Sequence, residues 1–129
     1  MTEKVKLLLI GNKRVKPTEA ENTKRLFDNY APGLYDITHL VGTEDCIKSV
    51  DVLCPRIIII NDKIKGAKEL LEKIKQIRPE IVVFVFLSAV DDEQHAIDEY
   101  MQRGAYKCYM PPIIMDTLAH DMYVALHLE

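Results

Sequence analysis

Short apolar runs alternate with amphipathic stretches along the whole chain, and there are five of each. This alternation is typical of repeated βα units that build a parallel sheet. Residues 57–60 and 81–87 are apolar without a break, as strands covered by helices on both faces must be, so we expect them at the centre of the sheet. The five expected strands cover residues 5–10, 34–40, 56–61, 81–87 and 106–110.

The amphipathic stretches carry helix signals. Thr18 and Glu21 have the spacing of a capping box, which predicts a first helix from residue 18 whose apolar side carries Leu26 and Phe27. Gly104 suits a left-handed helix end. The expected helices cover residues 18–30, 43–53, 67–77, 91–104 and 114–127. The third should bury Leu70, Leu71 and Ile74, and the fifth should bury Leu118, Met122 and Ala125. Asp91 is the expected cap of the fourth helix.

Five such units with right-handed crossovers leave few topologies. We expect one α/β domain over residues 1–129, a flavodoxin-like three-layer sandwich with a five-stranded parallel sheet in the order 2-1-3-4-5 and five helices. The first and fifth helices should cover one face and the other three helices the opposite face. In this topology, sites form at the carboxyl ends of strands 1 and 3.

Charge and hydropathy indicate which partners and which cellular compartment to expect. The net charge is −3 and the basic residues are scattered, which argues against a nucleic-acid partner. No apolar run approaches the ~18 residues of a membrane span, and the first residues lack the pattern of a signal peptide. We therefore expect a cytoplasmic protein with no membrane partner.

The cysteines and histidines form no ligand pattern. Cys46, Cys54 and Cys108 are odd in number and show no CxxC spacing, so reduced thiols are expected. The histidines at 39, 95, 120 and 127 lack metal-ligand spacing. We expect neither a metal nor a cofactor.

Four short motifs resemble the receiver domain of bacterial response regulators, the family that includes the chemotaxis regulators. They are the apolar run from Pro55 to Asn61 with Gly66 five residues later, Leu87-Ser88-Ala89, Gly104-Ala105, and Pro112. The resemblance implies a place in two-component, or phosphorelay, signal transduction. It also implies a cis bond between Pro111 and Pro112.

The chain departs from this family where the chemistry takes place. Gly11-Asn12 stands where the family has an acidic pair that holds Mg²⁺, Asn61 where it has the phosphoacceptor aspartate, and Pro111 where it has a lysine. A neutral amide cannot form an acyl phosphate, and Mg²⁺ is normally held by carboxylates. The resemblance therefore predicts a degenerate pocket, that is, a pseudo-receiver with no enzymatic activity.

Other positions of that pocket allow further interpretations. Ser88 matches the family's hydroxyl residue, and Cys108 takes the place of its switch aromatic. Asp62 is an alternative phosphoacceptor, although adjacent strand residues point to opposite sides, so it should not share the Asn61 pocket. A third interpretation is a small-ligand domain in which Lys13 and Arg14 bind an anion, although the loop lacks phosphate-binding spacing.

The leading hypothesis is a protein-interaction module that works without aspartyl phosphorylation. In the family, partners and dimer mates use the fourth helix, the fifth strand and the fifth helix. The expected partner is a signalling protein or a histidine kinase, with a homodimer as a second form of association. The residues expected on this surface are His95, Asp98, Glu99, Gln102, Lys107, Tyr109, His120 and Tyr123.

Overall fold

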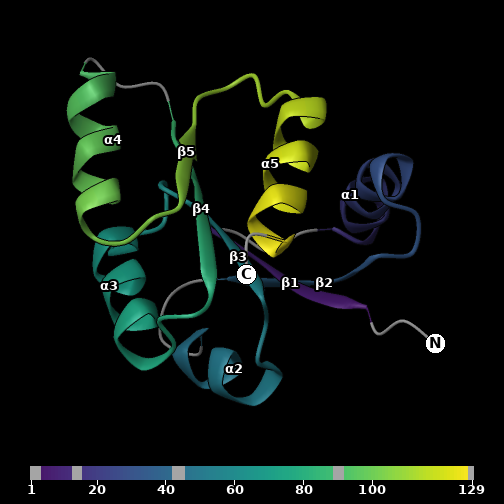
Figure 1. Ribbon diagram of the computed structural model, residues 1–129, viewed down its shortest axis with the longest axis horizontal. Coiled ribbons are helices and arrows are strands. Elements are labelled where there is room, and N and C mark those ends of the chain that lie inside the picture. Colours follow the sequence, from purple (N-terminus) through teal and green to yellow (C-terminus); the bar gives the residue numbers. More distant parts are fainter. Residues whose placement is uncertain (1–3, 13–15, 42–45, 89–91, 128–129) are drawn as a thin grey trace.

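The computed structural model describes residues 4–12, 16–41, 46–88 and 92–127. These residues form five strands and five helices in strict alternation (Figure 1). In chain order they are β1 (Val5–Gly11), α1 (Pro17–Tyr30), β2 (Tyr35–Val41), α2 (Cys46–Leu53), β3 (Ile57–Asn61), α3 (Ala67–Ile77), β4 (Val82–Phe86), α4 (Glu93–Gln102), β5 (Lys107–Tyr109) and α5 (Met115–His127).

The strands form one parallel sheet in the order β2-β1-β3-β4-β5, which confirms the predicted flavodoxin-like topology. The run of four isoleucines is β3, and it pairs with β1 on one side and β4 on the other. All four of its isoleucines are at most 2% exposed, because helices cover both faces of the sheet.

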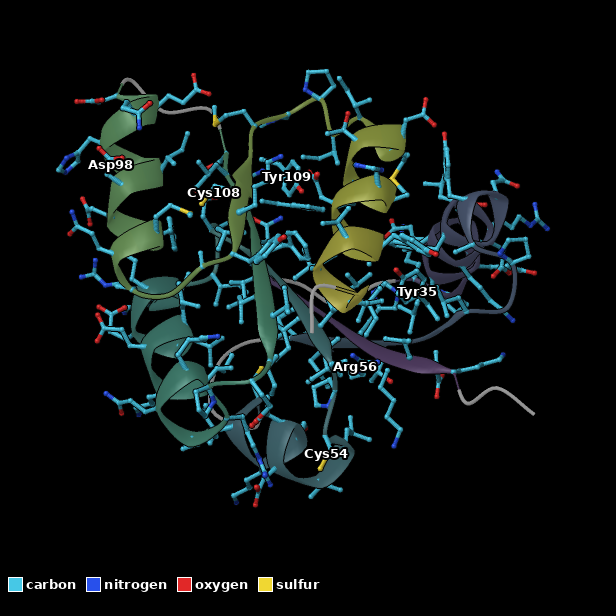
Figure 2. The ribbon with its side chains drawn as sticks, viewed as in Figure 1. Tyr35, Cys54, Arg56, Asp98, Cys108 and Tyr109 are labelled. Atoms are coloured by element: carbon cyan, nitrogen blue, oxygen red, sulfur yellow. The ribbon has the colours of Figure 1, made fainter. Side chains whose placement is uncertain are left out.

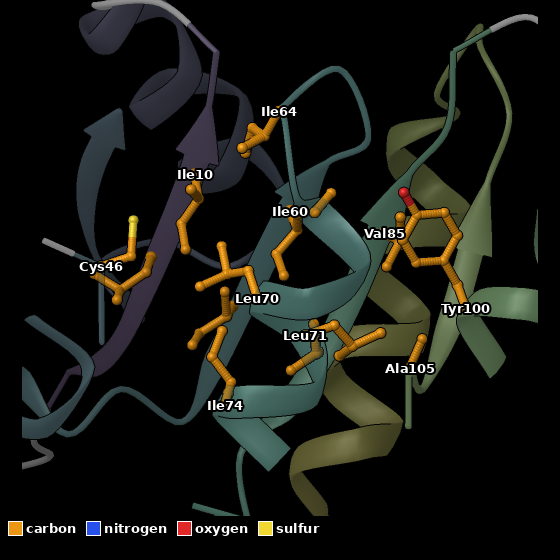
Figure 3. Close-up of a cluster of buried hydrophobic side chains, with 14 of the residues drawn as sticks. Ile10, Cys46, Ile60, Ile64, Leu70, Leu71, Ile74, Val85, Tyr100 and Ala105 are labelled. Carbon is orange, nitrogen blue, oxygen red and sulfur yellow. The ribbon is translucent and has the colours of Figure 1, made fainter. Parts of the chain in front are cut away.

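Two apolar layers hold the helices on the sheet, as the strand alternation predicts. Ile58 and Ile60 pack with residues of α2, α3 and α4, a side of the sheet that we call the α2–α4 face (Figure 3). Ile57 and Ile59 pack with residues of α1 and α5, which we call the α1/α5 face. Figure 1 shows α3 and α4 on one side of the sheet, and α5 and α1 on the other.

Helices α3 and α5 bury the side chains that their periodicity predicts. Leu70, Leu71 and Ile74 of α3 are at most 3% exposed. In α5, Leu118 and Met122 are at most 1% exposed, and Ala125 is also buried. An apolar stripe at helical spacing was a sufficient signal for both helices.

The prediction for α1 was wrong in two respects. The helix begins at Pro17 with Lys16 as its N-cap and has no side-chain cap, so the expected capping box of Thr18 does not form. The proline takes the first turn because its fixed φ suits that position. Leu26 is 45% exposed, and Phe27 is the buried residue of this helix.

Helix α4 is capped by Asp92, whose carboxylate accepts the N–H of His95 at 3.0 Å. Asp91, the predicted cap, and Thr43, the predicted start of the second helix, lie outside the described residues. Gly104 follows α4 with φ +110°, in the positive range that the sequence predicted for it.

No disulfide joins the three cysteines, as expected: Cys46 is buried, Cys54 is exposed and Cys108 is half-buried. Among the helices of the described residues, none is both long enough and apolar enough to cross a lipid bilayer.

Candidate functional site

The parallel register brings the ends of β1 and β3 together. Ile10 is the partner of Ile60, so Gly11 and Asn61 end adjacent strands side by side. Both line a cavity of about 150 Å³ on the α1/α5 face, together with Leu9, Ile10, His39, Ile59 and Phe86. The structure thus joins two of the predicted pocket positions, while Asn12 is exposed.

Asn61 shapes the loop that follows β3. Its Oδ1 accepts the backbone N–H of Lys63 at 3.0 Å, which is an Asx turn. Its backbone carbonyl accepts the N–H of Ile64 at 3.2 Å. The Asn61 amide therefore serves the geometry of the loop.

Asp62 makes its contacts with the end of β4. Its Oδ1 accepts the backbone N–H of Ser88 at 2.8 Å, and its own N–H donates to the carbonyl of Phe86 at 3.0 Å. These two bonds tie the loop after β3 to the end of β4. Asp62 does not line the cavity that Asn61 lines.

The side chains at this edge do not fit the Mg²⁺ site of a receiver domain. Gly11 has no side chain, and Asn12 and Asn61 carry neutral amides. Mg²⁺ in proteins is usually held by one or two carboxylates. Within the described part of the chain, no three His, Cys, Asp or Glu side chains are grouped so as to hold a metal ion.

His39 of β2 is a cavity residue that the sequence analysis did not single out. Its Nε2 atom is buried and has no hydrogen-bond partner among the described residues. Burial lowers the pKa of this imidazole, which favours its neutral form. The alternation of side chains along β2 could have indicated His39, because it places Tyr35, Ile37 and His39 on the same face of the sheet.

The remaining pocket positions lie on and after β4 and β5. Cys108 pairs with Val85 and packs on the α2–α4 face, where burial raises the pKa of its thiol to about 11. Ser88 is half-buried, and Pro111 and Pro112 are exposed. The bond between the two prolines is cis, as the resemblance predicted.

The residues expected on the interaction surface lie on α4, β5 and α5. On α4, His95, Asp98 and Gln102 are exposed. Glu99 instead turns toward α3: it forms an ion pair with Lys68, and its carboxylate lies 2.7 Å from His95 Nε2. The hydrogen bond from Lys68 keeps the pKa of Glu99 below its ordinary value.

Lys107 and Tyr109 of β5 both bind Asp121 of α5, at 2.8 Å and 2.6 Å. Figure 2 shows Tyr109 between β5 and α5. Burial and this hydrogen bond raise the pKa of Tyr109 well above its ordinary value. Tyr123 and His120, also on α5, line a second cavity that α5 forms with α1.

These elements together give the chain the fold of response regulator receiver domains. A receiver domain from Clostridium thermocellum matches with a TM-score of 0.76 and 17% identity, over 95% of this chain and 94% of that chain. The signal receiver domain of a DNA-binding response regulator from Colwellia psychrerythraea matches with a TM-score of 0.77 and 16% identity, over 95% and 98%. An orphan response regulator of H. pylori gives 0.74 and 16%, over 95% and 97%.

The resemblance found in the sequence is thus confirmed for the fold. No protein-family model and no curated protein matches the chain. At identities of 16–17% the shared property is the fold, and fold alone does not define function.

Proposed function

We propose that this chain is a phosphorylation-independent protein-interaction module of two-component signalling in the cytoplasm. The observation that carries the proposal is the arrangement at the end of β3. Asn61, which the proposal takes as the phosphoacceptor position, bonds to Lys63, whereas the neighbouring Asp62 bonds to Ser88 at the end of β4. A neutral amide is no nucleophile for a phosphoryl group.

The Asp62 contact also supports a single conformational state. A charge-assisted hydrogen bond of 2.8 Å between a carboxylate and a backbone N–H is among the stronger kinds in proteins. It fixes the end of β4 to the loop after β3 without any ligand. A domain built in this way has no need of phosphorylation to set this contact.

The interaction surface of the proposal is the exposed side of α4 and β5. It carries polar His95, Asp98 and Gln102, together with Met101, which is 42% exposed, and Lys107. Mixed polar and apolar exposure suits a non-obligate protein interface. The proposed partner is a signalling protein such as a histidine kinase.

The fixed state is tested by nuclear magnetic resonance with Mg²⁺ and beryllium fluoride, the agent that activates the DrrB receiver domain. The amide signals of Asn61, Asp62, Ser88 and Cys108 should keep their positions, while a receiver with a phosphoacceptor aspartate shifts under the same conditions. Saturable shifts at these amides would contradict the proposal. Their loss in Asp62→Asn would then identify Asp62 as the acceptor.

The interaction surface is tested by binding to the cytoplasmic parts of the organism's histidine kinases. The double variant Asp98→Ala/Gln102→Ala should weaken binding at least tenfold. The matched control is Glu19→Ala/Asn22→Ala, which changes two exposed residues of α1. Binding to no kinase, or equal losses in both double variants, would contradict the proposed partner or surface.

A further inference from the structure

Helices α1 and α5 enclose a cavity of about 260 Å³ with the start of β2. Four aromatic side chains line it: Phe27 and Tyr30 of α1, Tyr35 of β2 and Tyr123 of α5. Phe27 and Tyr35 are each 5% exposed and form the floor, whereas Tyr30 and Tyr123 are 45% and 57% exposed and form the rim. Figure 2 shows Tyr35 in the space between α5 and α1.

The floor of the cavity is buried and uncharged. The rings of Phe27 and Tyr35 meet edge to face, with centroids 5.6 Å apart and an interplanar angle of 68°. This is a favoured arrangement for two aromatic rings. Burial raises the pKa of Tyr35 to about 12, so its phenol remains neutral.

A carboxylate stands at the rim. Asp116, in the first turn of α5, lines the cavity together with Tyr30. The charge of Asp116 raises the pKa of Tyr30. The remaining described residues of the lining are Ala31, Leu34, Ala119 and His120, so no lysine or arginine takes part.

Aromatic faces together with a carboxylate favour a cation. The π-face of a ring attracts a positive charge within about 6 Å of its centroid, and sets of such rings recognise quaternary ammonium groups. The volume lies just below the range of about 300–1,000 Å³ of drug-sized ligands, so the occupant is small. A quaternary cation has no N–H donors that the apolar floor would leave unpaired.

We propose that this cavity binds a free, small quaternary ammonium compound of the choline class. The cationic head lies against Tyr123, Tyr35 and Tyr30, and Asp116 balances its charge. The site lies on the α1/α5 face, away from α4, so it adds a ligand-binding activity to the proposed interaction module.

The test is a titration of the ¹⁵N-labelled chain with choline chloride at pH 8, where histidine side chains generally carry little charge. Choline should shift amides of α1 and α5 saturably, and tetramethylammonium should shift the same ones. The neutral isostere 3,3-dimethylbutan-1-ol should bind at least tenfold more weakly, because it has the shape of choline without its charge. Sodium chloride at equal concentration controls for ionic strength.

Tyr123→Leu and Asp116→Asn should each raise the Kd for choline at least fivefold. The matched controls are Tyr106→Leu and Glu69→Gln, which change exposed residues outside the cavity lining and should leave Kd within twofold. Equal affinity for the neutral isostere, no shift in 10 mM choline, or equal losses in the controls would overturn the proposal. Tighter binding of a trimethyllysine peptide than of choline would overturn the assignment to a free small molecule.

Discussion

The polar residues at the end of β3 show how one step along a strand separates two roles. Asn61 and Asp62 are neighbours in sequence, but a strand turns successive side chains to opposite faces. Asn61 therefore lines the cavity beside Gly11, whereas Asp62 reaches the end of β4. The Asp62 carboxylate therefore does not lie where a receiver domain carries its phosphoacceptor aspartate.

Gly104 is a residue at which an added methyl group meets an obstacle. Its φ is +110°, and a Cβ built there would lie 2.9 Å from Cγ of Lys75. Lys75 cannot move aside easily, because its Nζ donates to the carbonyls of Pro79 and Ile81, each at 2.8 Å. Gly104→Ala should lower the free energy of unfolding by about 2–3 kcal/mol, measured by urea denaturation.

The matched control is Gly33→Ala. Gly33 also has a positive φ, +68°, but a Cβ there meets no atom within 4 Å. Gly33→Ala should lower the free energy of unfolding by about 1 kcal/mol, because only the backbone strain contributes. Equal losses in the two variants would show that the contact with Lys75 contributes nothing.

Asp121 leads to a prediction of how the free energy of unfolding depends on pH. Burial opposes ionisation of this carboxyl, but the hydrogen bonds from Lys107 and Tyr109 outweigh it and keep its pKa below the ordinary value. A lowered pKa means that the stabilisation is complete above the unfolded pKa of about 4 and is lost as the pH falls through the folded pKa. Asp121→Asn should cost about 1–2 kcal/mol of unfolding free energy at pH 7.

The difference between wild type and Asp121→Asn should be constant from pH 6 to 8 and should shrink below about pH 4. Urea denaturation across this range measures it. Asp98→Asn changes an exposed carboxylate and should stay within about 0.5 kcal/mol of wild type. A difference that grows as the pH falls would contradict the account of Asp121.

At the scale of elements, polar side-chain contacts connect adjacent helices and strands in addition to the apolar layers. Lys107 and Tyr109 join β5 to α5 through Asp121. Arg103 of the α4 end lies 2.7 Å from Glu72 of α3, and Lys68 of α3 pairs with Glu99 of α4. The Asp62 bond to Ser88 does the same for the ends of β3 and β4.

Removing the Asp62 carboxylate should therefore loosen the end of β4. Asp62→Ala should cost about 1–2 kcal/mol of unfolding free energy, because it leaves the half-buried N–H of Ser88 without this acceptor. Amide hydrogen exchange at Ser88 should accelerate in the same variant. Asp62→Asn keeps a side-chain oxygen and should recover part of both effects; full loss in both variants, or none in either, would contradict the role of the contact.

The elements were largely predictable from the sequence because each has its own periodic signal. The isoleucines of β3 and the stripe of α3 fixed those elements to within one residue at each end. The bounds of α1 were also predicted to within one residue, but its cap was not, because Thr18 and Glu21 imitate a capping box while Pro17 already satisfies the first turn. Local patterns compete there, and the sequence does not rank them.

The candidate site was predictable in part. The ends of β1 and β3 follow from topology, so Gly11 and Asn61 could be placed together. The bond between Asp62 and Ser88 could not, since it depends on how the loops after β3 and β4 approach each other. The aromatic cavity could not either, because its rings come from three elements that only the folded chain assembles.

At the scale of the whole molecule, the structure separates three regions. The cavity of Gly11 and Asn61 lies at the carboxyl ends of β1 and β3, the proposed interaction surface lies on α4 and β5, and the aromatic cavity lies between α1 and α5. The central claim is that the first of these regions performs no phosphoryl chemistry. The claim concerns missing groups, so it can be tested by putting them back.

The most direct test is incubation with acetyl phosphate and Mg²⁺, followed by intact mass measurement. Wild type and Asn61→Asp should gain no phosphoryl group, because a lone carboxylate binds Mg²⁺ poorly and no fixed cation balances the charge on the phosphoryl oxygens. The variant Gly11→Asp/Asn12→Asp/Asn61→Asp/Pro111→Lys, which restores the acids and the lysine together, should gain one. A phosphoryl group on the wild-type chain would contradict the account.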